Sequence, residues 1–71
     1  MNQVSPKKLL HSKWTAVTPV RREKHFMVTA ILDDESGQPV SCCLEAVHSG
    51  KERTLPWREL KDATLWRQGW V

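Results

Sequence analysis

The strongest structural signal in the sequence lies between residues 25 and 47. Two runs rich in β-forming residues, HFMVTAIL (25–32) and VSCCLEAV (40–47), flank the turn-forming stretch DDESGQP (33–39). Apolar residues alternate with other residues in both runs, as expected for strands with one buried face. We therefore predict an antiparallel hairpin, closed by a three-residue loop at 35–37 with Gly37 in the left-handed conformation of a bulged turn.

This loop fixes which residues face each other and which side they occupy. It places Phe26 opposite Ala46, Val28 opposite Leu44 and Leu32 opposite Val40. The predicted inner face then contains Phe26, Val28, Ala30, Leu32, Val40, Cys42, Leu44 and Ala46. Met27 and Ile31 fall on the outer face, where apolar side chains of this size favour a covering partner.

A second hairpin follows from the Ser49-Gly50 pair, read as a two-residue turn. In this register His48 faces Lys51, Leu44 faces Leu55 and Cys42 faces Trp57. Both hairpins thus send their apolar residues to one common face. A further strand is predicted over residues 13–17, with Trp14 and Ala16 on one face, and it ends at Pro19 and the charged run RREK (21–24).

The pattern changes after Leu55. Pro56 suits the first position of a single helical turn at residues 57–60. Asp62 can cap a short helix over residues 63–67, which Gly69 would end. A helix this short must dock on the sheet to be stable, and its anchors would be Leu65, Trp66 and Trp70.

The predicted fold is therefore mainly β: a small antiparallel four-stranded meander or SH3-like barrel with a short C-terminal helix. An open sheet with that helix across one face is the alternative. Residues 1–7 are predicted to form a flexible basic N-terminal arm, because they are rich in turn-forming and polar residues. Residues 8–71 are predicted to form one small β domain.

Length and charge exclude several classes of protein. A chain of 71 residues fits one small domain, and no apolar stretch is long enough to span a membrane. The net charge is +3, but residues 1–25 carry six basic residues against one acidic residue, while residues 26–71 carry five against seven. The excess of positive charge therefore lies in the first third, which is evidence about partners. Two adjacent cysteines and no others favour a reducing cytoplasm over a disulfide scaffold.

The sequence contains no pattern typical of catalysis or metal binding. Cys42 and Cys43 are neighbours on a predicted strand, so they point to opposite faces and cannot share one ion. A dyad of Cys43 and His25 across strands is conceivable, but nothing orients the histidine. We therefore predict no enzymatic activity, no metal, no cofactor and no small-molecule substrate.

Nucleic-acid binding is the function with the most support from the residues. Ser5-Pro6-Lys7-Lys8 resembles a short basic element of histone tails that lies along A·T-rich minor grooves. The predicted nucleic-acid-binding residues are Lys7, Lys8, Lys13, Trp14, Arg21, Arg22 and Lys24, with the cations on phosphates and Trp14 stacked on unpaired bases. RNA, DNA or the ribosome would be the partner. The alternative is a protein–protein interaction or homodimerisation module that uses the outer face at Met27 and Ile31.

Several segments together resemble a known family. They are residues 5–16 (SPKKLLHSKWTA), 23–26 (EKHF), 44–47 (LEAV) and 55–62 (LPWRELKD), followed by Trp66 and Gly69-Trp70. In order and spacing they are similar to the small bacterial tryptophan-rich family of unknown function. The resemblance implies a bacterial, stand-alone cytoplasmic protein, and it brings no assigned activity, cofactor or site residue.

Overall fold

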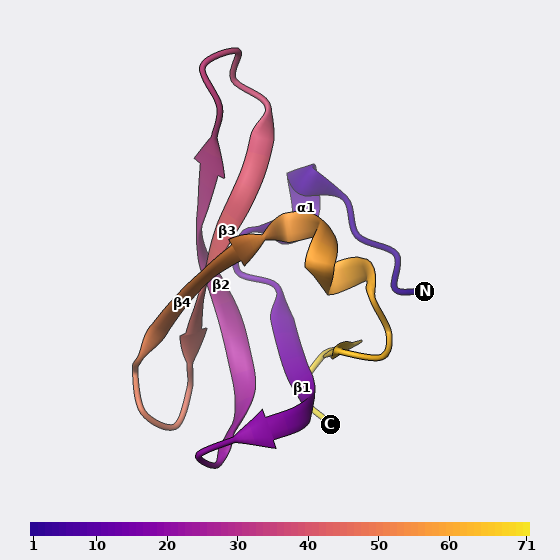
Figure 1. The fold of residues 1–71 in the computed structure, drawn as a ribbon, viewed down its shortest axis with the longest axis vertical. Helices are drawn as coiled ribbons and strands as arrows, with labels where there is room; N and C mark the ends of the chain where they lie inside the picture. Colours follow the sequence, from indigo (N-terminus) through magenta and orange to yellow (C-terminus); the bar gives the residue numbers. More distant parts are fainter.

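A computed structural model describes residues 1–71, and in it five strands form a single antiparallel sheet. The strand order is β4-β3-β2-β1-β5, so the last strand pairs with the first (Figure 1). The elements are α1 (Pro6–Leu9), β1 (Lys13–Val20), β2 (Glu23–Asp33), β3 (Pro39–Ala46), β4 (Glu52–Pro56), the 3₁₀ turn η1 (Trp57–Lys61) and β5 (Trp66–Gln68). The prediction of a mainly β antiparallel fold is confirmed, whereas the predicted number of four strands is wrong.

The central hairpin of β2 and β3 is confirmed at both of its ends. Phe26 pairs with Ala46 and Val28 pairs with Leu44, while at the loop the Asp34 amide donates to the Gln38 carbonyl. Gly37 has a φ of 84°, the left-handed conformation predicted for a three-residue loop.

The middle of the same hairpin differs from the prediction by one residue. The register shifts between Val28 and Ala30 and returns to its original value between Leu32 and Asp33. Within this bulged stretch Ile31 pairs with Cys42 and packs against the core, while Leu32 and Val40 are exposed. The predicted pair of Leu32 and Val40, and the outward position of Ile31, are therefore wrong. A bulge inserts one residue into a strand and so reverses which side the next residues face.

The hairpin of β3 and β4 has the predicted faces but another register. Cys42 pairs with Leu55 and Leu44 pairs with Arg53, and residues 47–51 connect the two strands instead of the predicted two-residue turn. The shift is two residues, so side-chain direction is conserved, because strand side chains repeat every second residue. Leu55 remains inside, as predicted. Arg53, however, now occupies a position on the inner side.

The predicted C-terminal helix is absent. The single turn expected at residues 57–60 is present as η1, but the chain then forms a tight turn in which Asp62 Oδ1 accepts from the amide and hydroxyl of Thr64. Trp66–Gln68 continues as β5 and pairs with Trp14–Ala16 of β1. A helix of five residues is not stable by itself, whereas the unpaired edge of β1 offers backbone partners to an extended chain.

Strand β1 is longer than predicted and the N-terminus lies against the domain. Pro19 does not end β1, which runs to Val20 with an irregularity in its pairing with β2. Asn2 donates three hydrogen bonds, from its amide to Lys61 and from its side chain to Leu60 and Trp66 carbonyls. The mobility of residues 1–7 stays a prediction, but this contact ties their start to η1 and β5.

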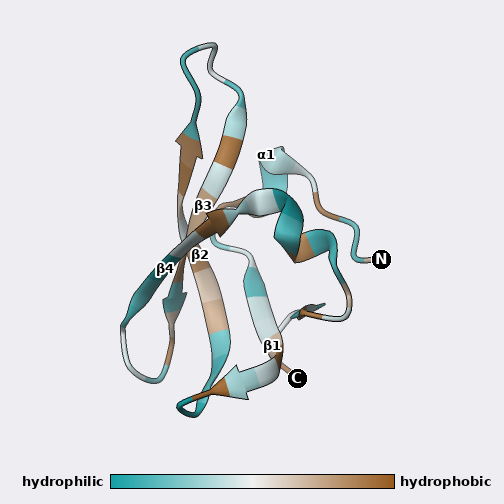
Figure 2. Ribbon diagram, viewed as in Figure 1, coloured by the Kyte–Doolittle hydropathy of each residue, from teal (hydrophilic) through white to brown (hydrophobic).

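The core fills the concave side of the curved sheet. Val28, Leu44 and Leu55 are buried together, as the common inner face predicted. The buried set is Leu9, Trp14, Thr15, Ala16, Phe26, Val28, Cys42, Leu44, Ala46, Leu55, Trp57, Leu60 and Trp66. The turn between β1 and β2 and the loop between β2 and β3 are hydrophilic and lie at opposite ends of the long axis (Figure 2). None of the helices has the length and apolar character needed to cross a membrane.

Candidate nucleic-acid interface

The predicted basic residues do not form one continuous surface. Lys7 and Lys8 lie on α1, whereas Arg21 and Arg22 form the turn between β1 and β2. Figure 1 shows α1 in the upper half of the molecule and this turn at its lower end. Any ligand that contacts all four cations would therefore have to follow the length of the sheet.

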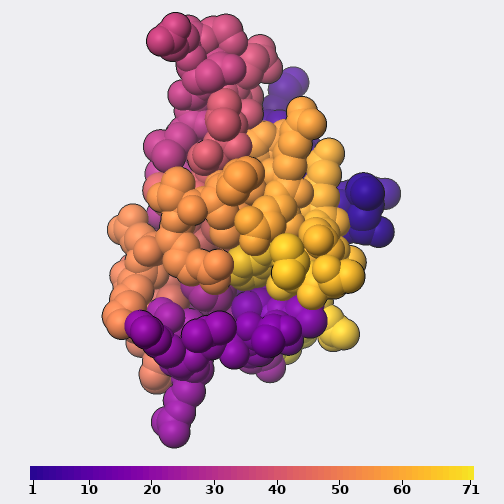
Figure 3. All heavy atoms as spheres, viewed as in Figure 1, coloured from indigo at the N-terminus to yellow at the C-terminus, as the bar shows by residue number.

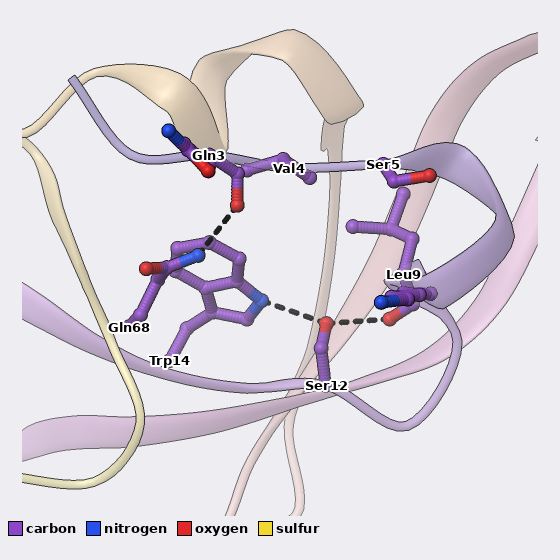
Figure 4. A pocket seen from close by; sticks show the side chains of 8 residues that line it. Gln3, Val4, Ser5, Leu9, Ser12, Trp14 and Gln68 are labelled. Atoms are coloured by element: carbon purple, nitrogen blue, oxygen red, sulfur yellow. Dashed lines mark hydrogen bonds between the residues drawn. The ribbon is translucent and has the colours of Figure 1, made fainter.

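The predicted role of Trp14 in stacking on bases is not compatible with its position. Its side chain is only 2% exposed, and its indole Nε1 donates to Ser12 Oγ at 2.8 Å. Ser12 Oγ in turn donates to the Leu9 carbonyl, so the ring is fixed inside the domain (Figure 4). A base needs an accessible ring face for stacking, and Trp14 offers none.

A hollow of about 430 Å³ lies beside this indole, between the N-terminal segment and β5. Figure 4 shows Gln3 and Gln68 at one side of it, where the Gln68 side-chain amide donates to the Gln3 carbonyl. Lys8 is the only charged residue of its lining, and the remaining polar groups are amides and serine hydroxyls. This hollow has too little charge to be a strong phosphate site.

Positive charge gathers instead around β1, β2 and β5. One hollow of about 410 Å³ is lined by Arg22, Lys24, His25, Val47 and His48. A second, of about 220 Å³, is lined by Lys24 and Arg67 together with Thr15, Ala16, Val17 and Val71. Lys24 borders both hollows, and neither lining contains an Asp or Glu side chain. We call Lys13, Arg22, Lys24, His25, His48, Arg67 and Trp70 the basic face.

Strand pairing explains why these residues meet. Thr15 pairs with His25 of β2 on one side and with Arg67 of β5 on the other, so the three residues form one row across the sheet. Sequence analysis missed Arg67 because it assigned this residue to a helix. His25, His48 and Trp70 were likewise not among the predicted nucleic-acid-binding residues. His25 was considered only in a dyad with Cys43, and Trp70 only as an anchor on the sheet. Only the pairing of β5 with β1 brings Arg67 to Lys24.

Trp70 is the exposed aromatic residue of this face. Its ring is 40% exposed, while its indole Nε1 donates to the Phe26 carbonyl at 3.0 Å. Lys13 Nζ lies 4.8 Å from the ring centroid, and the His25 ring centroid lies at 5.9 Å. Trp70 is thus held in one orientation beside Lys13 and His25, and its ring lies outside the core.

The segment that carries Trp70 is fixed through one buried hydroxyl. Thr15 Oγ1 donates to the Gly69 carbonyl at 2.7 Å and accepts from the Val71 amide at 3.1 Å. Thr15 is the only buried polar residue of the chain, at 2% exposure. Because a buried hydroxyl costs free energy unless it is hydrogen-bonded, these two bonds fix the position of residues 69–71.

The turn beside the basic face is strained. Arg21 and Arg22 have φ values of 54° and 65°, and Val20 pairs with Glu23 across them. Two consecutive residues with positive φ form the tight hairpin turn that Asn-Gly or Gly-Gly pairs normally occupy. Side chains with a Cβ pay about 1–2 kcal/mol per residue in this conformation. Two arginines therefore occupy turn positions at which Asn or Gly would give a more stable backbone.

Acidic residues also lie close to this face. Glu23 stands between Arg22 and Lys24 in the chain, and its carboxylate accepts from Ser49 Oγ. Glu45 of β3 pairs directly with Glu52 of β4, on the side of the sheet away from β1 and β5. Like charges directly opposite each other destabilise a strand pair. Glu45 also pairs with Met27 of β2, so this acidic pair lies next to β2.

Cys43 and His25, the two residues of the conceivable dyad, do not lie opposite each other in the sheet. Cys43 pairs with Ala30, whereas the His25 carbonyl accepts from Val47, so the strand register separates the two members of the conceivable dyad. Burial, and secondarily its neighbours Cys43 and Glu59, raises the pKa of the Cys42 thiol to about 11. This thiol is therefore not a nucleophile at neutral pH. No group of three or more His, Cys, Asp and Glu side chains is placed to hold a metal ion.

Comparison with known proteins agrees with the resemblance seen in the sequence. No curated protein and no solved structure matches the chain. A family model described as tryptophan-rich protein (DUF2389) matches residues 12–71, which include all five strands and all four tryptophans. The chain belongs to this tryptophan-rich protein family, DUF2389.

Proposed function

We propose that this protein is a non-catalytic binding module that contacts single-stranded RNA or DNA, free or within a ribonucleoprotein, through the basic face. The observation that carries the proposal is the position of Lys24. It borders two adjacent hollows whose other charged residues are Arg22 and Arg67, and neither lining has a carboxylate side chain. Lysine and arginine side chains are the main phosphate-binding groups of nucleic-acid-binding proteins.

The exposed indole favours single strands over duplexes. Trp70 lies beside Lys13 and is held by its hydrogen bond to Phe26. Proteins that bind single strands combine a positively charged groove with aromatic rings on which unpaired bases stack. Lys13, Arg22 and Lys24 are retained from the residues predicted by sequence, and Arg67 and Trp70 are added. Lys7, Lys8 and Arg21 would contact a longer ligand outside this face.

The arrangement of strands supports a further part of the proposal, that the sheet is a small SH3-like barrel. Strand β5 pairs back onto β1, and a 3₁₀ turn connects β4 to β5. The Arg53 guanidinium of β4 lies 5.7 Å from the ring of Trp66 of β5, so a side chain of one edge strand reaches a ring on the other. Two free cysteines, one of them buried, are consistent with a reducing bacterial cytoplasm.

The test is binding of a labelled oligouridylate, and of the matching oligodeoxythymidylate, in a filter assay at 50 and 200 mM salt. The informative variant is Lys24→Ala with Arg67→Ala. Its matched control is Arg58→Ala with Lys61→Ala, which removes the same charge from the region around Trp57. Each lost contact between a phosphate and a cation lowers the slope of log affinity against log salt by ~0.7 for single strands.

The proposal predicts a slope smaller by ~1.4 for the first variant, so that the wild-type protein loses about 7-fold more affinity between the two salt concentrations. The control should stay within about threefold of wild type at both concentrations. Absence of salt-dependent binding to both oligonucleotides, or equal losses in the two variants, contradicts the proposal.

The alternative of homodimerisation through the outer face at Met27 and Ile31 loses one of its two residues, because Ile31 packs against the core. Sedimentation of the wild-type protein tests it directly. A self-association that Met27→Lys abolishes would support it, whereas a monomer at all concentrations contradicts it.

A further inference from the structure

One buried polar group in the protein has no hydrogen-bond partner. It is the indole Nε1 of Trp66, on β5. The other three indoles each donate to a defined acceptor: Trp14 to Ser12 Oγ, Trp57 to the Pro39 carbonyl and Trp70 to the Phe26 carbonyl. Because nearly all buried polar groups in proteins are hydrogen-bonded, an exception needs a physical reason.

Trp66 lines a small hollow at the open side of the curved sheet. The hollow measures about 140 Å³ and lies where the end of β1 meets β4, η1 and the start of β5. Its apolar walls include Ala16, Val20 and Leu65, of which Val20 and Leu65 are largely exposed. In Figure 3 the segments coloured purple, orange and yellow, which contain these residues, meet on one face of the molecule.

An arginine side chain covers this region. Arg53 pairs with Leu44, and its guanidinium lies 5.8 Å from the centroid of Phe26 and 5.7 Å from that of Trp66. Strands β4 and β5 are the two unpaired edges of the sheet, so no backbone closes the gap between them. Arg53, which is exposed, is the side chain of β4 that reaches the Trp66 ring across this gap.

We propose that this hollow, which we call the Trp66 site, binds one apolar residue of an extended peptide segment of a partner protein. Rotation of Arg53 opens access to Trp66 Nε1, which then donates to a backbone carbonyl of the peptide. Arg53 donates to the same or the next carbonyl, and Glu59, also in the lining, accepts a peptide N–H. This inference is independent of the nucleic-acid proposal, because no residue of the basic face lines the Trp66 site. Ala16 lines both this hollow and the hollow between Lys24 and Arg67.

The size and the charges of the hollow select this occupant. Drug-sized ligands occupy roughly 300–1,000 Å³, so a hollow of about 140 Å³ accommodates a single side chain and not a whole small molecule. A carboxylate next to a guanidinium and an indole N–H suits a peptide unit, which has one donor and one acceptor. The same carboxylate repels a phosphate, which argues against a nucleic acid. Extended peptides are commonly bound at exposed sheet edges with pockets for single side chains.

The experiment is a titration of ¹⁵N-labelled full-length protein, observed through its four indole N–H signals. The probe is N-acetyl-leucine methylamide, which presents one apolar side chain between two peptide units. N-acetyl-glycine methylamide is the matched control probe without that side chain. The proposal predicts a saturable shift of the Trp66 signal with half-saturation at ~10 mM, and shifts at least threefold smaller for the three indoles that already have partners.

Two variants make the result decisive. Trp66→Phe keeps an aromatic ring but removes the N–H, and Arg53→Ala removes the cover and its donors. Both should weaken binding of the leucine probe at least fivefold, followed through the backbone amides of Ala16 and Thr18. Far-UV circular dichroism and the dispersion of the amide spectrum show whether each variant is folded.

Three outcomes would overturn the proposal. The Trp66 signal does not move at 50 mM of the leucine probe, or it moves equally with the glycine probe, or folded Trp66→Phe binds as tightly as wild type. A shift of the Trp66 signal on addition of oligouridylate, with none from the leucine probe, would assign the site to nucleic acid instead. Failure here leaves the salt-dependence test of the basic face unaffected.

Discussion

Replacing Trp66 by Phe should have little effect on stability, although Trp66 is a large core residue. The ring is 2% exposed and packs edge to face on Phe26, with the centroids 5.3 Å apart. A shorter aromatic ring leaves a void of roughly 40 Å³, which at ~24 cal/mol per Å³ costs about 1 kcal/mol. The substitution also removes a buried donor without a partner, which relieves a cost of about 1–3 kcal/mol. The two effects oppose each other, so Trp66→Phe should stay within about 1 kcal/mol of wild type.

Trp57→Phe is the matched comparison. Trp57 is similarly buried, at 7% exposure, but its Nε1 donates to the Pro39 carbonyl at 3.0 Å. This substitution creates the same kind of void and in addition breaks a hydrogen bond, leaving the carbonyl without that partner. We expect a loss of about 2 kcal/mol or more.

Urea unfolding at pH 7, followed by far-UV circular dichroism, measures both changes with the same protein concentration and buffer. We expect Trp57→Phe to be less stable than Trp66→Phe by more than about 1 kcal/mol. Equal destabilisation of the two variants would mean that the Trp66 N–H is satisfied in the folded protein. That result would also remove the main support for the Trp66 site.

Three further predictions concern the turn, the buried hydroxyl and the buried thiol. The double substitution Arg21→Asn and Arg22→Gly relieves the backbone strain at two residues with positive φ. It should stabilise the protein by about 1–2 kcal/mol in urea unfolding and weaken oligouridylate binding at 50 mM salt. Unchanged or lower stability would argue against strain in this turn. Thr15→Val removes the two hydrogen bonds that hold residues 69–71 and should lower the free energy of unfolding by about 1–3 kcal/mol. The fluorescence emission of Trp70 should shift to longer wavelength. Thr15→Ser keeps the hydroxyl and should retain most of the stability. The pKa of the Cys42 thiol is near 9.0 in the unfolded chain and about 11 in the folded protein. The unfolded state therefore loses this proton first as the pH rises, so the free energy of unfolding should decline between pH 9 and pH 11. The decline is at most roughly 2.7 kcal/mol. Cys42→Ala should abolish that part of the decline and Cys43→Ala should not; an identical pH profile for wild type and Cys42→Ala would refute it.

The sequence was sufficient to predict that Phe26, Val28, Leu44 and Leu55 lie on one inner face of the sheet. Side chains of a strand repeat every second residue, so an error of two residues in the register does not change the face. The assumed two-residue turn at Ser49-Gly50 is wrong, yet Leu55 lies inside with Leu44, since the register moved by an even number. A register shift of one residue instead turns each side chain to the other face of the sheet. The bulge after Val28 turned Ile31 inward, and nothing in the apolar run Ala30-Ile31-Leu32 marks that change.

The C-terminal segment could not be predicted from local signals. Asp62 and Gly69 suit the ends of a helix, but the free edge of β1 competes for the same residues and wins by providing backbone hydrogen bonds. The same error affected the predicted site, because Arg67 lies beside Lys24 only when β5 pairs with β1. Trp14 was assigned to the wrong role for a related reason, since strand alternation does not reveal that both sides of β1 are covered at that point.

The most direct test of the proposed function is a titration of the ¹⁵N-labelled protein with a short oligouridylate at low salt. If the basic face binds single strands, the largest amide shifts will lie at residues 22–25 and at Arg67, and the indole signal of Trp70 will move while those of Trp14 and Trp57 do not. Shifts confined to Lys7 and Lys8, or no shifts at all, would contradict the proposal that β5 and β1 together build a nucleic-acid interface.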